Sequence, residues 1–151
     1  TTATVPLTIV DDRVDEQDET ITVAIADSGI AVPDLATHVY TILDDDHTPS
    51  FTGAVIEPSS PTVATPLAVV CTGWQDEDGD PEQYFYQWKR DGELLADATG
   101  PTLPVAYCSP GRTISCVVTA TDGVNTGNTI ETDPVQIAAG GSTAAGRWEE
   151  Y

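Results

Sequence analysis

Short runs in which apolar and polar residues alternate are the feature of this 151-residue chain that most constrains its fold. Clusters of Asp, Gly, Pro and Ser separate these runs. Side chains alternate between the two faces of a β-strand, whereas an amphipathic helix repeats its apolar residues every three or four positions. No repeat of the helical kind continues for three turns in this sequence. The sequence therefore predicts an all-β fold.

The pattern divides the chain into two units and a terminal segment. The first unit, residues 1–47, is expected to contain strands at 4–10, 20–26 and 38–44. A polar junction that contains a proline leads to the second unit, residues 51–138. Strands are expected there at 53–58, 67–73, 84–90, 113–121 and 128–138, with turns at 90–93 and 109–112. Residues 139–151 read as a linker or tail segment in which small residues precede Trp148 and Tyr151.

Acidic residues outnumber basic residues by 25 to 5, which gives a formal net charge of −20. A surface of that sign repels phosphate backbones and anionic lipid at long range, so nucleic-acid binding is not expected. No apolar run reaches the roughly 18 residues that would predict membrane insertion. The three cysteines lack zinc-site spacing and histidine partners, which favours a disulfide in an oxidising compartment. We therefore expect an exported protein.

Two acidic blocks stand directly beside predicted strands. The first places six carboxylates within residues 11–19, and the second is the triple aspartate at 44–46. Without a cation such clusters are costly, because two carboxylates about 5 Å apart repel each other by roughly 1 to 3 kcal/mol. Calcium takes six to eight oxygen ligands in irregular geometry, which suits carboxylates at strand ends. The alternative is a solvated acidic loop, as charge runs usually are.

The order and spacing of these blocks resemble the C-terminal half of a Calx-beta domain. The motifs LTIVDDRVDEQDETITVAIAD and YTILDDDHTP carry this resemblance, which covers residues 4–46. The resemblance implies calcium (Ca2+) ligands at one end of a β-sandwich. Carried over position by position, these ligands are Asp11, Asp12, Glu16, Glu19, Asp44, Asp45 and Asp46.

A full Calx-beta sandwich begins with further strands that residues 1–47 do not contain. Three strands with one apolar face uncovered do not form a stable sandwich alone, because that face would meet water. We expect the missing strands to come from a longer polypeptide or from another copy of the chain. The segment GGSTAAGRWEEY faintly resembles a motif of the earlier half of such domains, from which Trp148 and Glu149 depart. Docking of this segment into the next copy would polymerise the chain head-to-tail into a filament, whereas a plain linker is the alternative.

The second unit carries Cys71, Trp88 and Cys116 in the frame VVCTGW, YFYQWKRDG and TISCVVTATDG. This frame resembles the immunoglobulin-like or PKD-like repeats of large exported bacterial proteins. The resemblance implies a disulfide between Cys71 and Cys116, with Trp88 in the core against it. Cys108 is left over: a bond to Cys116, a free buried thiol and a link between chains all stay open. Together the two resemblances predict an incomplete Calx-beta sandwich followed by one complete immunoglobulin-like β-sandwich.

A third acidic run, DEDGD at residues 76–80, spaces its aspartates like the first ligands of an EF-hand loop. Pro81 and Gln87 occupy the positions where that loop requires glycine and glutamate, so an EF-hand is excluded. A calcium loop of another kind and a plain acidic turn both fit the run. The candidate ligands of such a loop are Asp76, Asp78, Asp80 and Asp122.

Aromatic residues alternate along the predicted strand at 84–90. Tyr84, Tyr86 and Trp88 share one face and are expected to point into the core. Trp74 follows the strand at 67–73 and is expected to be exposed, where it could contact a ligand.

No catalytic motif is present in the sequence. The two histidines, His38 and His47, stand apart, and there is no nucleophile elbow, zinc-protease motif or phosphate-binding loop. We therefore predict a non-enzymatic, calcium-stabilised structural module of an exported bacterial protein, at the cell surface or outside the cell. Its expected partners are neighbouring domains or other copies of itself. The alternative is an adhesin module that binds carbohydrate or a receptor through Trp74.

Overall fold

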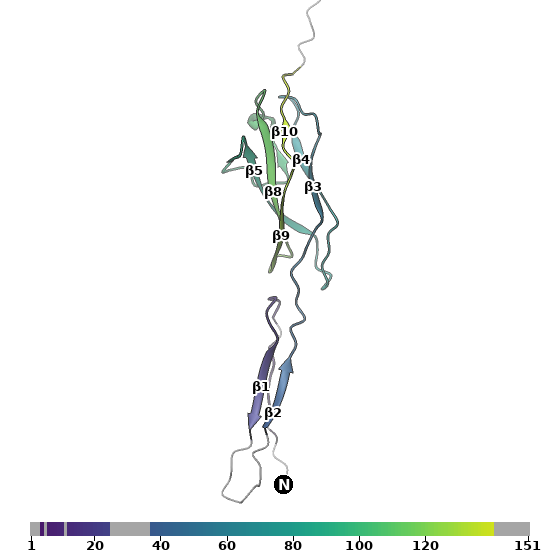
Figure 1. Ribbon diagram of the computed structural model, residues 1–151, viewed down its shortest axis with the longest axis vertical. Coiled ribbons are helices and arrows are strands. Elements are labelled where there is room, and N and C mark those ends of the chain that lie inside the picture. The colour runs from purple at the N-terminus through teal and green to yellow at the C-terminus, as the bar shows by residue number, and fades with distance from the viewer. Residues whose placement is uncertain (1–3, 5, 11, 25–36, 141–151) are drawn as a thin grey trace, which may run out of the picture.

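The computed structural model describes residues 4, 6–10, 12–24 and 37–140. Apart from one 3₁₀ turn, η1 (Val105–Tyr107), the regular structure of this part of the chain consists of antiparallel strands. The predicted all-β fold is confirmed. Figure 1 shows a two-stranded hairpin and a β-sandwich that follow each other along the long axis, joined by the connection 43–52. The described residues contain no helix with the length and apolarity needed to cross a membrane.

In the first unit, two strands pair with each other: β1 (Glu19–Ala24) and β2 (Thr37–Ile42). Their antiparallel register places Ile21 opposite Tyr40 and Val23 opposite His38. Both strands begin within a residue of the positions that the alternating pattern predicted.

The segment 4–10, predicted as a third strand, is not a strand in its described residues, 4 and 6–10. A strand exists only where its N–H and C=O groups bond to a neighbouring strand. Within the described ranges, β1 and β2 pair only with each other. The prediction was wrong here because apolar alternation indicates which face is apolar and does not report whether a partner strand is available.

Apolar side chains of the first unit remain exposed. The exposed fraction is 62% for Leu7, 57% for Ile9 and 71% for Leu43. Two strands do not enclose a core, so these side chains meet solvent. Val5 and Ile25, which are further apolar residues of the predicted strand ranges 4–10 and 20–26, lie outside the described residues.

The second unit is a β-sandwich of two antiparallel sheets. One sheet has the order β3 (Gly53–Glu57), β4 (Leu67–Thr72) and β7 (Thr102–Leu103). The other has the order β10 (Val135–Gln136), β8 (Thr113–Thr121), β5 (Gln83–Arg90) and β6 (Glu93–Leu94). β9 (Thr126–Glu131) also pairs with β8, which is therefore the central strand.

The range 128–138, predicted as a single strand, is divided into β9 and β10 by residues 132–134. Pro134 lies in this interruption, and proline has no backbone N–H to donate to a ladder. Both strands pair with β8, at different points along its length: Ile130 lies opposite Val118, and Val135 lies opposite Ile114.

The core lies between the two sheets. Trp88 on β5 is fully buried, and its indole N–H donates a hydrogen bond to the carbonyl oxygen of Gly100 at 2.9 Å. Leu67 and Leu103 from the three-stranded sheet and Val118 from β8 are buried around the same centre. The core position predicted for the tryptophan is confirmed.

Tyr84 and Tyr86 alternate with Trp88 along β5 and are partly buried against the same core. The inward orientation predicted for this face of the strand is therefore confirmed. Burial raises the pKa of the Tyr86 hydroxyl to about 12. Phe85, on the opposite face of β5, is 62% exposed.

The three cysteines are free thiols in the structure. Cys116 on β8 is fully buried opposite Trp88, and burial raises the pKa of its thiol to about 12. Cys71 on β4 is half-buried, and the buried Cys108 thiol lies 3.7 Å from the carbonyl oxygen of Thr65. The bond predicted between Cys71 and Cys116 is thus absent from the structure. Because the two residues lie on different sheets of the sandwich, as that bond requires, the pairing stays a prediction.

Candidate metal site and the junction between the two units

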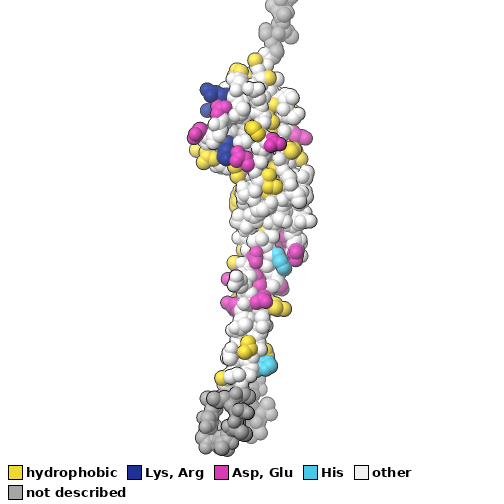
Figure 2. All heavy atoms as spheres, in the orientation of Figure 1, with side chains coloured by type: hydrophobic (Ala, Val, Ile, Leu, Met, Phe, Trp, Pro, Cys, Tyr) yellow, Lys and Arg dark blue, Asp and Glu magenta, His cyan; other side chains and the backbone are white. Residues whose placement is uncertain are grey.

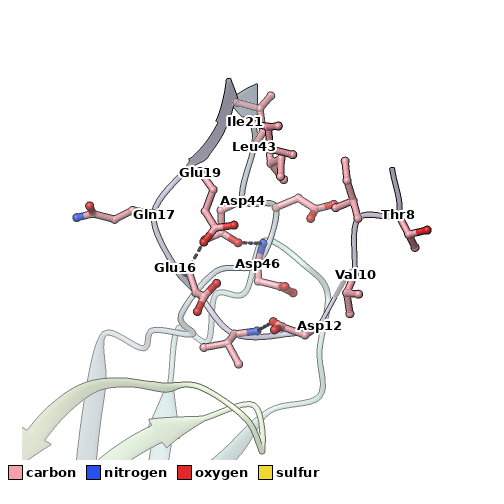
Figure 3. A pocket seen from close by; sticks show the side chains of 14 residues that line it. Thr8, Val10, Asp12, Glu16, Gln17, Glu19, Ile21, Leu43, Asp44 and Asp46 are labelled. Atoms are coloured by element: carbon pink, nitrogen blue, oxygen red, sulfur yellow. Dashed lines mark hydrogen bonds between the residues drawn. The ribbon is translucent and has the colours of Figure 1, made fainter. Parts of the chain in front are cut away.

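A pocket of about 370 Å³ opens in the first unit, between the hairpin and the segments that flank it. Ile21 and Leu43 line it beside the strands, and Asp12 and Asp46 are among the carboxylates that line it toward the sandwich (Figure 3). The acidic end forms because β1 and β2 are antiparallel: the residues that precede β1 and those that follow β2 meet at one end of the hairpin. The sequence motifs on either side of the hairpin are therefore brought together.

Most of the predicted ligands line this pocket. Asp11 lies outside the described residues. The predicted ligands on the pocket wall are Asp12, Glu16, Glu19, Asp44, Asp45 and Asp46.

Backbone N–H groups that donate hydrogen bonds to carboxylates connect the two acidic segments. Asp44 Oδ2 accepts a hydrogen bond from the backbone N–H of Glu16 at 2.6 Å, and Asp44 Oδ1 accepts one from Asp46 at 3.3 Å. Asp18, which the resemblance did not include among the ligands, accepts a hydrogen bond from the N–H of Asp44 at 3.1 Å. Asp12 Oδ1 accepts hydrogen bonds from the N–H groups of the two residues that follow it, at 2.8 and 3.0 Å.

The donor set of the pocket has the chemistry that calcium prefers, since every candidate ligand is a carboxylate oxygen. In the described ranges, no three His, Cys, Asp or Glu side chains are placed to coordinate one ion. In the hydrogen bonds above, Asp12 and Asp44 direct oxygens at backbone N–H groups. To hold a calcium ion, the side chains of Asp12 and Asp44 would have to turn toward the pocket. Its positive charge would offset the mutual repulsion of the carboxylates.

The DEDGD run forms a second acidic loop, at the end of the sandwich that faces the first unit (Figure 2). Asp76 Oδ1 accepts hydrogen bonds from the N–H groups of Asp78 and Asp80, each at 3.0 Å. Asp76 Oδ2 is buried and has no hydrogen-bond partner within the described part of the chain. A buried carboxylate oxygen of this kind is costly unless a positive group approaches it.

The four ligands predicted for this loop are not brought to one pocket. A pocket of about 560 Å³ beside the loop is lined by Asp76 and Asp80, and Asp78 and Asp122 are not part of its lining. Asp78 binds the connection between the units, as described below. Asp122 closes the turn after β8, where its Oδ1 accepts hydrogen bonds from the N–H groups of the second and third residues that follow it, at 2.7 and 2.6 Å.

His47, in the connection between the units, binds the DEDGD loop with its backbone and its ring. The backbone N–H donates to Asp78 Oδ2 at 2.7 Å, and Nδ1 lies 3.0 Å from Asp78 Oδ1. Nε2 lies 3.5 Å from Glu77 Oε2. The hydrogen bond to Asp78 raises the pKa of His47 above its ordinary value and lowers the pKa of the Asp78 carboxyl. These contacts hold the connection against the sandwich.

Asn125, in the turn between β8 and β9, makes a second contact between the units. Its Oδ1 accepts a hydrogen bond from the backbone N–H of Asp15 at 3.1 Å, and its Nδ2 donates to the carbonyl oxygen of Arg13 at 2.9 Å. Sequence reasoning missed this residue. An asparagine after an Asp-Gly pair indicates a turn, but nothing in the sequence relates it to a loop more than 100 positions away.

Trp74 is half-buried, so the expectation that it is exposed is wrong in part. Its ring packs edge-to-face against Tyr84, with 5.6 Å between the ring centroids, and it joins the periphery of the core. It nevertheless lines the pocket beside the DEDGD loop.

Comparisons of the chain with models of protein families, with curated proteins and with solved structures found no match. The resemblances to a Calx-beta domain and to immunoglobulin-like repeats therefore rest on the sequence motifs quoted above.

Proposed function

We propose that the chain is a non-enzymatic, calcium-stabilised structural module of an exported bacterial surface or extracellular protein, and that it holds two β units in a fixed relative orientation. The observation that carries this proposal is the pair of contacts across the junction, from His47 to Asp78 and from Asn125 to Arg13 and Asp15. Domains joined only by a flexible connection move freely unless an interface restrains them. Here side chains of the sandwich and of the connection restrain the junction.

Calcium would extend this restraint into the hairpin. The carboxylates of the pocket come from the loop before β1 and from the run after β2, and the second of these leads directly into the connection. An ion bound between the two segments would tie both to each other and to the connection. Because the ion binds the folded form alone, it stabilises that form by linkage.

Thermal unfolding of the full chain in EDTA and in millimolar calcium tests the metal. We expect calcium to raise the melting temperature, since free ligand at about 100 times its Kd stabilises by about 2.7 kcal/mol. The double variant Asp44→Asn, Asp46→Asn should lose this rise. The variant Asp97→Asn, an exposed aspartate of the sandwich, should keep it. An unchanged melting temperature for the wild-type chain at millimolar calcium would exclude the metal from the proposal.

The first unit also has the features of an incomplete sheet. Within the described residues each of its strands pairs on one edge only, which leaves backbone N–H and C=O groups available on the other. Exposed Leu7, Ile9 and Leu43 provide apolar surface beside them. Strands from a neighbouring domain or from another copy of the chain would pair with these edges and cover this surface. If residues 139–151 of another copy do so, the chains assemble head-to-tail into a filament.

An adhesin is a second candidate, favoured by the open pocket of about 560 Å³ that Trp74 lines beside the DEDGD loop. An aromatic ring next to polar groups is suited to stacking against a sugar or a receptor side chain. A glycan array probed with the wild-type chain, with Trp74→Ala and with Phe85→Ala as a control tests this role. Binding that disappears only with Trp74 would favour the adhesin.

A further inference from the structure

Asn125 occupies an unusual position, because its side chain reaches from the sandwich to the loop that carries predicted metal ligands of the first unit. It bonds to the backbone of Arg13 and Asp15. These residues lie between Asp12 and Glu16, both of which line the acidic pocket. The Asn125 amide thus fixes the main chain of the loop between two of the carboxylates that line the pocket.

The Asn125 side chain is itself held in place by its own turn. Its backbone N–H donates to Asp122 Oδ1 at 2.6 Å, and its Nδ2 also donates to Asp122 Oδ2 at 3.2 Å. Its carbonyl oxygen accepts a hydrogen bond from the hydroxyl of Thr121 at 2.9 Å. An amide whose orientation is set in this way presents a preorganised acceptor and donor to the loop, so little conformational entropy is lost when the loop binds.

The chemistry of the contact requires an amide. One atom must accept a hydrogen bond from the N–H of Asp15, and the other must donate to the carbonyl oxygen of Arg13. Asparagine and glutamine provide both functions at neutral charge, whereas aspartate provides only acceptors. Aspartate at this position would also add a negative charge beside Asp122.

We propose that Asn125 is a positioning residue through which the sandwich sets the geometry of the acidic pocket in the first unit. In its calcium-dependent part this inference rests on the proposed function. Residues that orient a metal-binding shell without touching the metal typically change metal affinity 10- to 100-fold when they are replaced. The effect is reciprocal. If the Asn125 contact raises the affinity for calcium by a given factor, bound calcium raises the equilibrium constant for forming that contact by the same factor.

The chain supplies a matched control three positions further along. Asn128 makes the same two kinds of hydrogen bond with its side chain: its Oδ1 accepts from the N–H of Phe51 at 2.9 Å, and its Nδ2 donates to the carbonyl oxygen of Phe51 at 2.9 Å. Phe51 belongs to the core of the sandwich. Replacing Asn128 therefore removes an equivalent pair of bonds without touching the loop of the first unit.

Calcium titration by calorimetry on the full chain, in wild-type, Asn125→Ala and Asn128→Ala forms, is the first arm of the test. The backbone at Asn125 does not adopt a positive φ, so alanine fits it without strain. We expect Asn125→Ala to weaken calcium binding by about tenfold or more, and Asn128→Ala to leave it unchanged while lowering the melting temperature. Equal effects of the two variants on calcium affinity would overturn the inference.

Residual dipolar couplings measured in EDTA form the second arm, which does not depend on calcium. The wild-type chain should fit one alignment tensor for both units, and Asn125→Ala should require two. A wild-type chain that already requires two tensors, or a variant that still fits one, would overturn the inference. If the wild-type chain binds no calcium, the calcium part of the proposed function is wrong. The dipolar couplings alone then test whether Asn125 positions the loop of the first unit. If Asn125→Ala proves too unstable to measure, Asn125→Gln takes its place. Because glutamine keeps the donor and the acceptor, this variant should retain part of the restraint between the two units.

Discussion

At the scale of single residues, Gly127 shows how closely the connection between the units lies on the sandwich. A Cβ atom at this position would overlap the backbone carbonyl of Pro49 and would also lie 3.2 Å from the Cβ of Ala120. Pro49 is among the fully buried residues, so it has no room to withdraw. A glycine inside a strand often marks such a close approach of another backbone, and here that backbone is the connection.

We therefore expect Gly127→Ala to displace the connection and to destabilise the sandwich by about 1 to 3 kcal/mol, as overpacking usually does. Urea unfolding gives the free energy, and amide chemical shifts of residues 47–51 report the displacement. Gly100→Ala is the control, because its added Cβ would meet the Thr102 carbonyl oxygen at 3.9 Å, an ordinary contact. Equal losses in the two variants would show that the contact with Pro49 is not the cause.

At the scale of elements, the positions of most strands could be predicted, and their partners could not. The strand around Trp88 is predicted because aromatic residues recur at every second position, Tyr84, Tyr86 and Trp88, as they do on one face of a half-buried strand. The segment 4–10 has the same alternation but no partner strand within the described residues, so it is not a strand. Pairing depends on which segments meet in space, and a single sequence does not contain that information.

The candidate site was likewise predictable in the positions of its residues and not in the contacts between distant segments. The acidic pocket was predictable in outline, because a hairpin brings together the residues before its first strand and after its second. The binding of Asp78 to His47 and of Asn125 to the loop of residues 13–15 was not predictable, because each joins segments that are distant in the sequence. Hydrogen bonds to backbone groups leave no pattern of residue types from which to infer them.

The β5–β6 hairpin offers a test at this scale. Its turn places Asp91 and Gly92 at φ values of 52° and 85°, and the Asp91 carboxylate accepts hydrogen bonds from the N–H of Thr113 at 3.0 Å and from Arg112 at 2.9 Å. The bond from Thr113 is the main reason that the pKa of Asp91 is lowered from its ordinary value. A carboxyl with a lower pKa in the folded state stabilises the fold above its unfolded pKa. That contribution is lost as the pH falls through the folded value.

Asp91→Asn should therefore be less stable than the wild-type chain at neutral pH, and the difference should shrink as the pH falls below about 4, the unfolded pKa of aspartate. Asparagine tolerates the positive φ, so the backbone of the turn is not strained. Denaturant unfolding at a series of pH values measures the difference. Asp97→Asn serves as the comparison. If the difference in free energy of unfolding between Asp91→Asn and the wild-type chain stayed constant down to acid pH, it would contradict this assignment.

At the scale of the whole molecule, the two units differ in how well they are enclosed. The sandwich has a continuous core, whereas the hairpin unit exposes apolar side chains next to strand edges. The net charge of −20 opposes association of copies in general, so any association must come from a specific surface. The exposed apolar residues of the first unit provide such a surface.

We expect sedimentation velocity of the full chain to show association that rises with protein concentration and that is strengthened by calcium, which reduces charge repulsion. The double variant Ile9→Ser, Leu43→Ser should lose this association, because it removes two exposed apolar side chains of the pocket. Phe85→Ser, which removes an equally exposed apolar side chain from the sandwich, should retain it. A wild-type chain that stays monomeric at high concentration with calcium would exclude completion of the first unit by other copies.

The few hydrogen bonds at the junction have a consequence for a chain under tension. Pulled at its two ends, the molecule would carry the load in series through the hairpin, the junction and the sandwich. The bonds made by Asn125 and His47 are few and partly exposed to water, whereas β5 and β8 share a ladder of eight residue pairs. The junction would therefore extend first, and it would re-form when the load is released, with the sandwich still folded.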